Sequence, residues 1–192
     1  MLTMRRLAAF ALSLTLLTAT GRPALAGHAM PLLAMADMPL GATVAGDSRY
    51  ASAAARTVRA IIEYTRWPAR HDPLVLCVAG SALHAGQLGA IRLADGRRIE
   101  RRNVAASAAA LGGCNVLYIG QVPLAQQRQL TAAVRGKGVL TIAEADPGMA
   151  SEAMFALTYR PNSLSFRLNI DAVARSGLKV DPRVLRVAQE GQ

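Results

Sequence analysis

Three short runs of apolar residues constrain the fold more than any other feature of this sequence. They lie at 74–79 (LVLCVA), 114–119 (CNVLYI) and 139–142 (VLTI), and a glycine directly follows each of the first two. Each run has the length of a β-strand. Strands that are apolar on both faces are typical of a parallel sheet covered by helices on both sides. The runs therefore predict a layered α/β fold.

Helical patterns alternate with these strands. Val58, Ile61, Ile62 and Thr65 lie at the spacing of one helix face, which predicts a helix capped by Ser48 or Ser52 that runs to about Thr65. Pro123 begins a second helix, at 124–135. The other expected elements are short helices at 84–90, 170–176 and 182–189, a strand at 97–104, and a hairpin of strands at 154–159 and 164–168. This order predicts one α/β domain with a mainly parallel central sheet flanked by helices, followed by a C-terminal hairpin and short helices.

The predicted strand at 97–104 differs from the others in its charge. Only Ile99 and Val104 are strongly apolar, and four of its residues are arginines. The four are Arg97, Arg98, Arg101 and Arg102. Such charge is typical of an edge strand that is kept from pairing with another chain. The same arginines could instead bind an anion or a partner protein, so both interpretations stay open.

Trp67 is the only tryptophan, and it lies where the first predicted helix ends before Pro68. An exposed tryptophan is a frequent anchor in protein–protein interfaces. A buried one at a helix end closes the core instead. Trp67 is therefore a candidate partner-binding residue together with the four arginines, and the core role is its alternative.

The N-terminal region has the pattern of an export signal. Arg5 and Arg6 precede an apolar run, and the small residues Ala24 and Ala26 form a cleavage pattern. The run is shorter than the roughly 20 apolar residues that a membrane-spanning helix needs, so an uncleaved anchor is the less favoured alternative. The expected organisation is a signal peptide at 1–26 cleaved after Ala26, a flexible leader at 27–48 and an α/β domain at 49–190.

The predicted export signal contributes part of the chain's positive charge. The sequence holds 22 Lys and Arg against 12 Asp and Glu, a formal net charge of +10. Removal of 1–26 takes away three arginines and no acid, which leaves +7. A basic chain often binds nucleic acid. Export to the periplasm argues against nucleic acid as a partner here.

Two cysteines, Cys77 and Cys114, lie in the expected domain. An even count in an oxidising compartment favours one disulfide, and two separate buried thiols are the alternative. The histidines show no ligand spacing with either cysteine, so we expect no metal site and no cofactor.

Catalytic motifs are lacking in the sequence. It has no Gly-x-Ser-x-Gly motif and no phosphate-binding loop of the Gly-x-x-x-x-Gly-Lys type. Glu144 and Asp146 form a carboxylate pair with no histidine nearby in sequence. The expectation is a protein that is not an enzyme.

Six segments match the motifs of a known family in the same order. They are 61–68 (IIEYTRWP), 76–80 (LCVAG), 114–119 (CNVLYI), 138–142 (GVLTI), 166–169 (FRLN) and 178–188 (LKVDPRVLRVA). With these segments the sequence resembles the YfiR-like family over roughly residues 56–188. It departs from the family pattern at 141–149, where a second cysteine pair is missing, and at Ser151 and Glu152, where Gly-Gly is usual.

The resemblance implies a periplasmic regulator that binds the sensor region of a YfiN-type diguanylate cyclase in the inner membrane. Such a protein represses cyclic-di-GMP synthesis and so controls biofilm formation and motility. A YfiB-like outer-membrane lipoprotein and a second copy of the chain are the further partners that it implies. An alternative from the residues is a small-molecule binding module. Its crevice would lie at the carboxyl ends of the parallel strands, after Ala79, Ile119 and Ala143.

Overall fold

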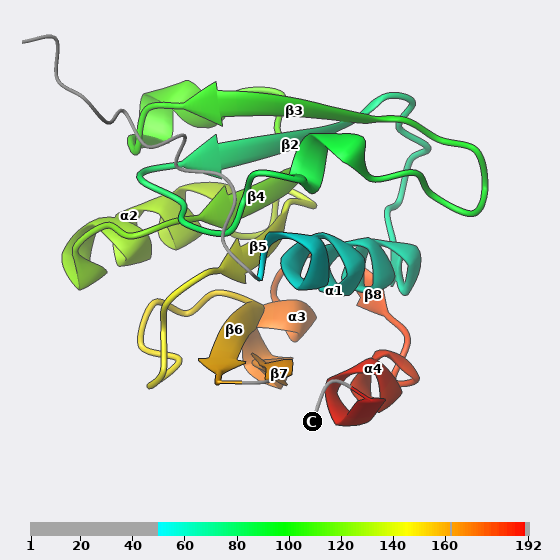
Figure 1. Ribbon diagram of the computed structural model, residues 1–192. Coiled ribbons are helices and arrows are strands. Elements are labelled where there is room, and N and C mark those ends of the chain that lie inside the picture. Colours follow the sequence, from blue (N-terminus) through cyan, green and yellow to red (C-terminus); the bar gives the residue numbers. More distant parts are fainter. Residues whose placement is uncertain (1–49, 162, 191–192) are drawn as a thin grey trace, which may run out of the picture. The chain divides into compact units, whose positions relative to one another are not determined.

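The computed structural model describes residues 50–161 and 163–190, and a six-stranded β-sheet lies at its centre (Figure 1). The strands are β2 (Leu74–Ala79), β3 (Ile99–Val104), β4 (Val116–Ile119), β5 (Leu140–Ala143), β6 (Phe155–Arg160) and β7 (Ser163–Leu168). They lie in the order β3-β2-β4-β5-β6-β7. All neighbours pair in parallel except β6 and β7, which form the predicted antiparallel hairpin. The predicted α/β class with a mainly parallel sheet is confirmed.

Helices cover both faces of this sheet. They are α1 (Ala51–Glu63), α2 (Leu124–Val134), α3 (Ile170–Ala174), α4 (Val184–Glu190) and two 3-10 helices, η1 (Leu88–Ala90) and η2 (Ala108–Leu111). Figure 1 shows α1 and α2 on opposite sides of the strands. Two small strands, β1 (Thr65–Arg66) and β8 (Lys179–Val180), pair antiparallel in a second sheet. This second sheet was not predicted, because two residues are too few to carry a strand pattern.

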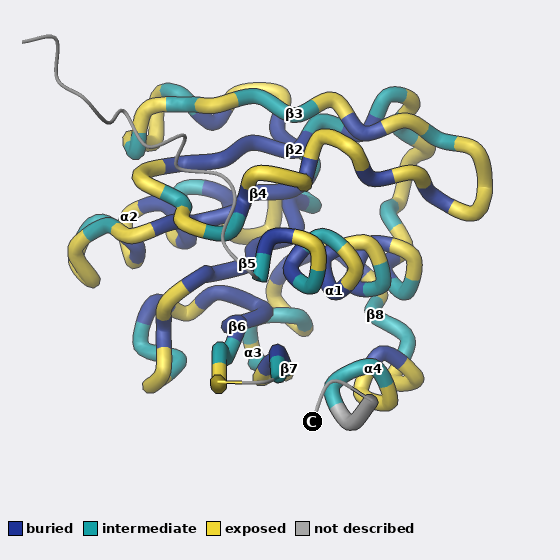
Figure 2. Tube along the Cα trace, in the orientation of Figure 1, coloured by how far each residue is buried: buried dark blue, intermediate teal, exposed yellow. Residues whose placement is uncertain are grey.

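Successive side chains along each strand point to opposite faces of the sheet, which divides the core into two layers. On β2, Leu76 and Val78 belong to the layer that packs against α1. Cys77 and Ala79 belong to the layer that packs against α2. Figure 2 shows these strands as almost entirely buried. Burial on both faces is the physical reason that the three apolar runs carry no polar alternation.

The first helix differs in detail from the prediction. It begins at Ala51, and the N-cap residue Tyr50 makes no side-chain cap bond. Ser52 is therefore inside the helix, where its hydroxyl donates to Oε1 of Gln87 at 3.0 Å, while Ser48 lies outside the described residues. The helix ends at Glu63 because the chain enters β1 at Thr65.

The predicted helix at 84–90 is wrong over its first half, since only the 3-10 helix η1 forms there. The backbone N–H groups of Leu83 and His84 donate to the carboxylate of Glu144 instead of entering a helix. The last two helices are confirmed in place but are shorter or shifted. Asn169 caps α3, because its side-chain oxygen accepts from the N–H of Ala172 at 2.9 Å.

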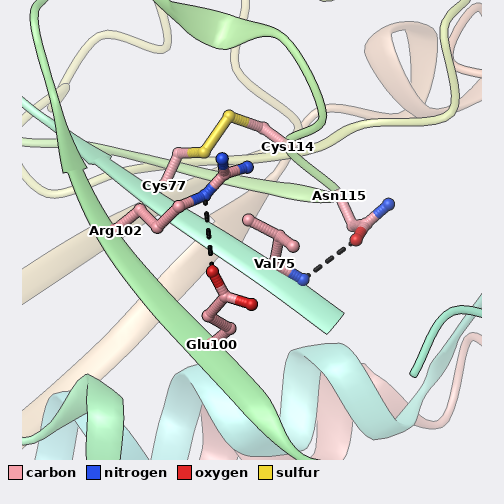
Figure 3. Close-up of a disulfide and its surroundings, with 6 residues drawn as sticks. All are labelled: Val75, Cys77, Glu100, Arg102, Cys114 and Asn115. Carbon is pink, nitrogen blue, oxygen red and sulfur yellow. Dashed lines mark hydrogen bonds and ion pairs between the residues drawn. A yellow bond between two sulfur atoms is a disulfide. The ribbon is translucent and has the colours of Figure 1, made fainter. Parts of the chain in front are cut away.

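A disulfide joins Cys77 in the middle of β2 to Cys114 just before β4, with a Cα–Cα distance of 5.8 Å (Figure 3). Two hydrogen bonds, one with a side-chain acceptor and one between backbone groups, hold the two segments side by side. Val75 N–H donates to the side-chain oxygen of Asn115, and Asn115 N–H donates to the carbonyl oxygen of Val75, both at 2.9 Å. The predicted pairing is confirmed, and the alternative of two separate thiols is wrong.

Candidate functional site

The structure places the predicted arginines on different surfaces. In the register of β3 with β2, Arg102 lies opposite Cys77 and therefore on the α2 side of the sheet. Figure 3 shows its guanidinium group beside the disulfide. Arg101 lies opposite Leu76 on the α1 side, and it donates to the side-chain oxygen of Asn103 at 3.1 Å. Neighbouring strand residues point to opposite faces, so these two arginines lie on opposite faces of the sheet.

Arg97 and Trp67, by contrast, are brought together. The guanidinium carbon of Arg97 lies 5.9 Å from the centre of the Trp67 ring, within cation–π range. The Arg97 Nε donates to Asp95 at 2.5 Å. Partial burial raises the pKa of Asp95, but the hydrogen bonds and charge of Arg97 outweigh it and hold that pKa below its usual value. Arg98 is exposed just before β3 and forms an isolated backbone bridge with Arg92.

Trp67 has features of both roles that the sequence left open. Its ring is half-buried and packs against the α1-side layer. Its indole Nε1 is buried and has no hydrogen-bond partner within the described part of the chain. An unpaired donor of this kind costs free energy in the folded protein. Trp67 therefore closes the core at the end of α1, and the guanidinium group of Arg97 lies over its ring.

The carboxyl ends of β2 and β4 are closed by the protein's own backbone. After β2 the chain forms β3 on one side of it, and the next strand, β4, lies on its other side. The strand order therefore reverses between β2 and β4, and open α/β sheets usually bind ligands at such a reversal, outside the carboxyl ends of the strands. Here Ser81 and Gln121 form a bridge, and Gln121 N–H donates to the Ser81 carbonyl oxygen at 2.7 Å. A Cβ atom added to Gly120 would lie 2.5 Å from the same oxygen. Glycine is needed there because the two loops approach so closely.

Glu144 follows β5 and holds this closed edge together. Its side chain is buried, with 2% of the residue exposed. Oε1 accepts from His84 N–H at 2.7 Å and from the hydroxyl of Tyr118 at 3.0 Å, and Oε2 accepts from Leu83 N–H at 2.9 Å. The carboxylate thus joins the loop after β2 to β4 and β5.

Aromatic rings cover the Glu144 carboxylate. The hydroxyls of Tyr118 and Tyr159 lie 3.3 Å apart, and the Tyr159 ring packs against His84 and Tyr50 with centroid distances of 4.2 and 5.3 Å. Burial, together with the nearby Glu144 charge, raises the pKa of Tyr118. Burial likewise raises the pKa of Tyr159. Both phenols therefore stay protonated and act as hydrogen-bonding groups.

Asp146 has a similar structural task and does not act as a partner of Glu144. Its Oδ1 accepts from Ala150 N–H at 2.9 Å, and its Oδ2 accepts from the N–H and hydroxyl of Ser151 at 3.0 and 2.5 Å. These bonds fix the loop between β5 and β6. Arg128 and Arg167 hold the same loop from outside by donating to the carbonyl oxygens of Ala150 and Pro147. The carboxylate pair noted in the sequence is therefore a pair of loop anchors.

Among the residues that the structure describes, no three His, Cys, Asp or Glu side chains gather as a ligand set. Within residues 50–161 and 163–190, no helix is both long and apolar enough to cross a lipid bilayer.

These features define a doubly wound α/β protein whose buried acids hold loops in place and whose arginines lie at its surface. The family model described as YfiR/HmsC-like matches residues 51–189, so this chain belongs to that family. The family suggests a periplasmic regulator of diguanylate cyclase signalling, and its members are regulatory rather than catalytic. The resemblance found in the sequence is confirmed.

Proposed function

We propose that this protein binds the periplasmic sensor region of an inner-membrane diguanylate cyclase of the YfiN type and keeps cyclic-di-GMP synthesis low. The family match carries the proposal, because it runs from the first residue of α1 into α4. The fixed loops at the carboxyl ends of the strands support a binding role. A surface held in one conformation before binding loses less entropy when a partner docks.

The proposal includes export to the periplasm, with the signal peptide at 1–26 cleaved after Ala26. These residues lie outside the described part of the chain. It also includes a YfiB-like outer-membrane lipoprotein that sequesters the repressor and so releases the cyclase, and a homodimer of this chain. Biofilm formation and motility are the processes that cyclic-di-GMP would then control.

The alternative of a small-molecule module at the strand ends loses support from the geometry. The backbone of Ser81 and Gln121 is paired there, and the Glu144 carboxylate accepts three hydrogen bonds from the protein itself. A ligand would have to displace these contacts. The exposed Arg98 and the Arg97–Trp67 pair, on separate parts of the surface, each fit a protein partner better, since interfaces favour Arg and Trp.

A gene deletion tests the proposal. Deleting the gene should raise cellular cyclic-di-GMP, measured by mass spectrometry, and the exported protein should restore the low level. The matched control is the same protein without residues 1–26, which should fail to restore it because the sensor region lies across the membrane. Unchanged cyclic-di-GMP in the deletion strain under several growth conditions would reject the repressor function.

A further inference from the structure

An open groove of about 480 Å³ lies between α1 and the connection from β2 to β3. Figure 1 shows this connection running beside α1. The α1 wall consists of residues at i, i+3, i+4 and i+7, which share one face of a helix. They are Ser52, Ala55, Arg56 and Arg59, and the opposite wall includes Gln87 and Arg92.

Side chains hold the two walls of this groove together. At one end, Ser52 donates to the side-chain oxygen of Gln87 at 3.0 Å. Beyond the lining residues, Glu63 accepts from Ala94 N–H at 2.8 Å. From Ser52 to Arg59, the first and last lining residues of α1, the helix rises about 10 Å. That is the length of about three residues of extended chain.

The groove carries more positive than negative charge. Arg56, Arg59 and Arg92 line it, and Glu63 pairs with Arg59 at 2.9 Å. Across the described residues, no carboxylate forms an ion pair with Arg56 or Arg92. Two cations on opposite walls therefore lack an acidic partner. A guanidinium group binds a carboxylate through two parallel hydrogen bonds, which makes arginine well suited to recognise acidic side chains.

We propose that this groove binds an acidic, extended segment of a partner protein, about three residues long, through carboxylates that contact Arg56 and Arg92. The two arginines lie on facing walls, so a segment with at least two acids would neutralise both. This inference rests on the proposed function in naming the partner: the segment would belong to the periplasmic region of the cyclase. The groove itself can be tested without that partner.

The direct test uses a fluorescein-labelled ten-residue peptide of alternating Glu and Ser, with a Gln and Ser peptide as its neutral control. Fluorescence anisotropy at low salt should show binding of the acidic peptide to the purified protein. The double variant Arg56→Glu/Arg92→Glu should weaken that binding roughly tenfold or more, since two attractive contacts become repulsive. Rising salt should weaken binding to the unmodified protein as well.

A matched variant separates the groove from net charge. Lys137→Glu/Arg175→Glu changes the charge by the same amount at exposed positions near the ends of α2 and α3. It should bind the acidic peptide within about twofold of the unmodified protein, and both variants should melt like it. Equal losses in the two variants would overturn the groove. Displacement of the peptide by low millimolar inorganic phosphate, or tighter binding of a ten-nucleotide single strand, would overturn an acidic peptide as its ligand.

The same variants in cells distinguish this inference from the proposed function. Loss of repression in Arg56→Glu/Arg92→Glu, with repression kept in the matched variant, supports both. If both variants repress fully and bind the peptide equally, the groove is wrong and the repressor function stands. If the unmodified protein does not repress but still binds the acidic peptide through Arg56 and Arg92, the function is wrong and the groove stands.

Discussion

Replacing Glu144 with glutamine should destabilise the protein without changing the size of the side chain. The carboxylate accepts hydrogen bonds at both oxygens, from two donors at Oε1 and one at Oε2. A carboxamide has one oxygen only. Whichever way it points, its NH₂ group faces an N–H or O–H donor, so at least one buried donor loses its acceptor.

The expected loss can be estimated from these contacts. An unsatisfied buried donor costs about 1–3 kcal/mol, and a hydrogen bond to a charged group contributes about 1.5–3 kcal/mol. We expect Glu144→Gln to lower the free energy of unfolding by about 2–4 kcal/mol. For a domain of this size that corresponds to a fall in melting temperature of roughly 10 °C.

Urea and thermal unfolding followed by circular dichroism would measure this loss. Glu100→Gln is the control, because Glu100 is exposed on β3 and its change should stay within about 0.5 kcal/mol. Hydrogen exchange should also become faster at the amides of Leu83 and His84 in the Glu144 variant alone. A melting temperature within about two degrees of the unmodified protein, with these amides still protected, would refute the structural role of Glu144.

Three further predictions concern stability. Because burial raises the pKa of Tyr118 and Tyr159 above the ordinary 10.0, their contribution is fully present below pH 10 and is lost as the pH rises above it. Urea melts across this range should show that loss, and Tyr118→Phe should make it shallower. Reduction of the Cys77–Cys114 disulfide should lower the free energy of unfolding by up to about 4 kcal/mol. A Cys77→Ala/Cys114→Ala variant should melt at the same temperature with and without reductant. Asn169→Ala should cost about 1 kcal/mol in urea unfolding through loss of the α3 cap, and Asn169→Ser should restore most of it.

The central sheet was predictable because its cause is local in the sequence. A strand buried on both faces must be apolar at successive positions, and the runs that became β2, β4 and β5 meet that requirement. The charge of β3 likewise predicted an edge strand, and β3 is at the edge of the sheet. Even the α2 boundary followed from Pro123, since proline favours a helix start.

The polar network around Glu144 could not be predicted in the same way. It joins groups from the loop after β2, from β4 and from β6, which are 15 to 61 residues away from Glu144 in the sequence. Hydropathy classed Tyr118 with the apolar residues of its strand, although its hydroxyl bonds to the carboxylate. The one available signal was an acid directly after a buried strand, and nothing near it in the sequence indicated its hydrogen-bond donors.

The four arginines on or next to β3 differ in their internal contacts, so they cannot all be tested by the same charge reversal. Arg97 is bound to Asp95 and Trp67, Arg101 is bound to Asn103, and Arg102 lies beside the disulfide, so charge reversal at any of them also removes an internal contact. Among the described residues, Arg98 takes part in hydrogen bonding only through its backbone, at Leu74 and Arg92, and it is exposed. Reversal of Arg98 is therefore the cleanest test of partner binding among the four. Reversal of Arg102, on the α2 side of the sheet, measures stability beside the disulfide as well, and a variant that combines the two would mix both effects.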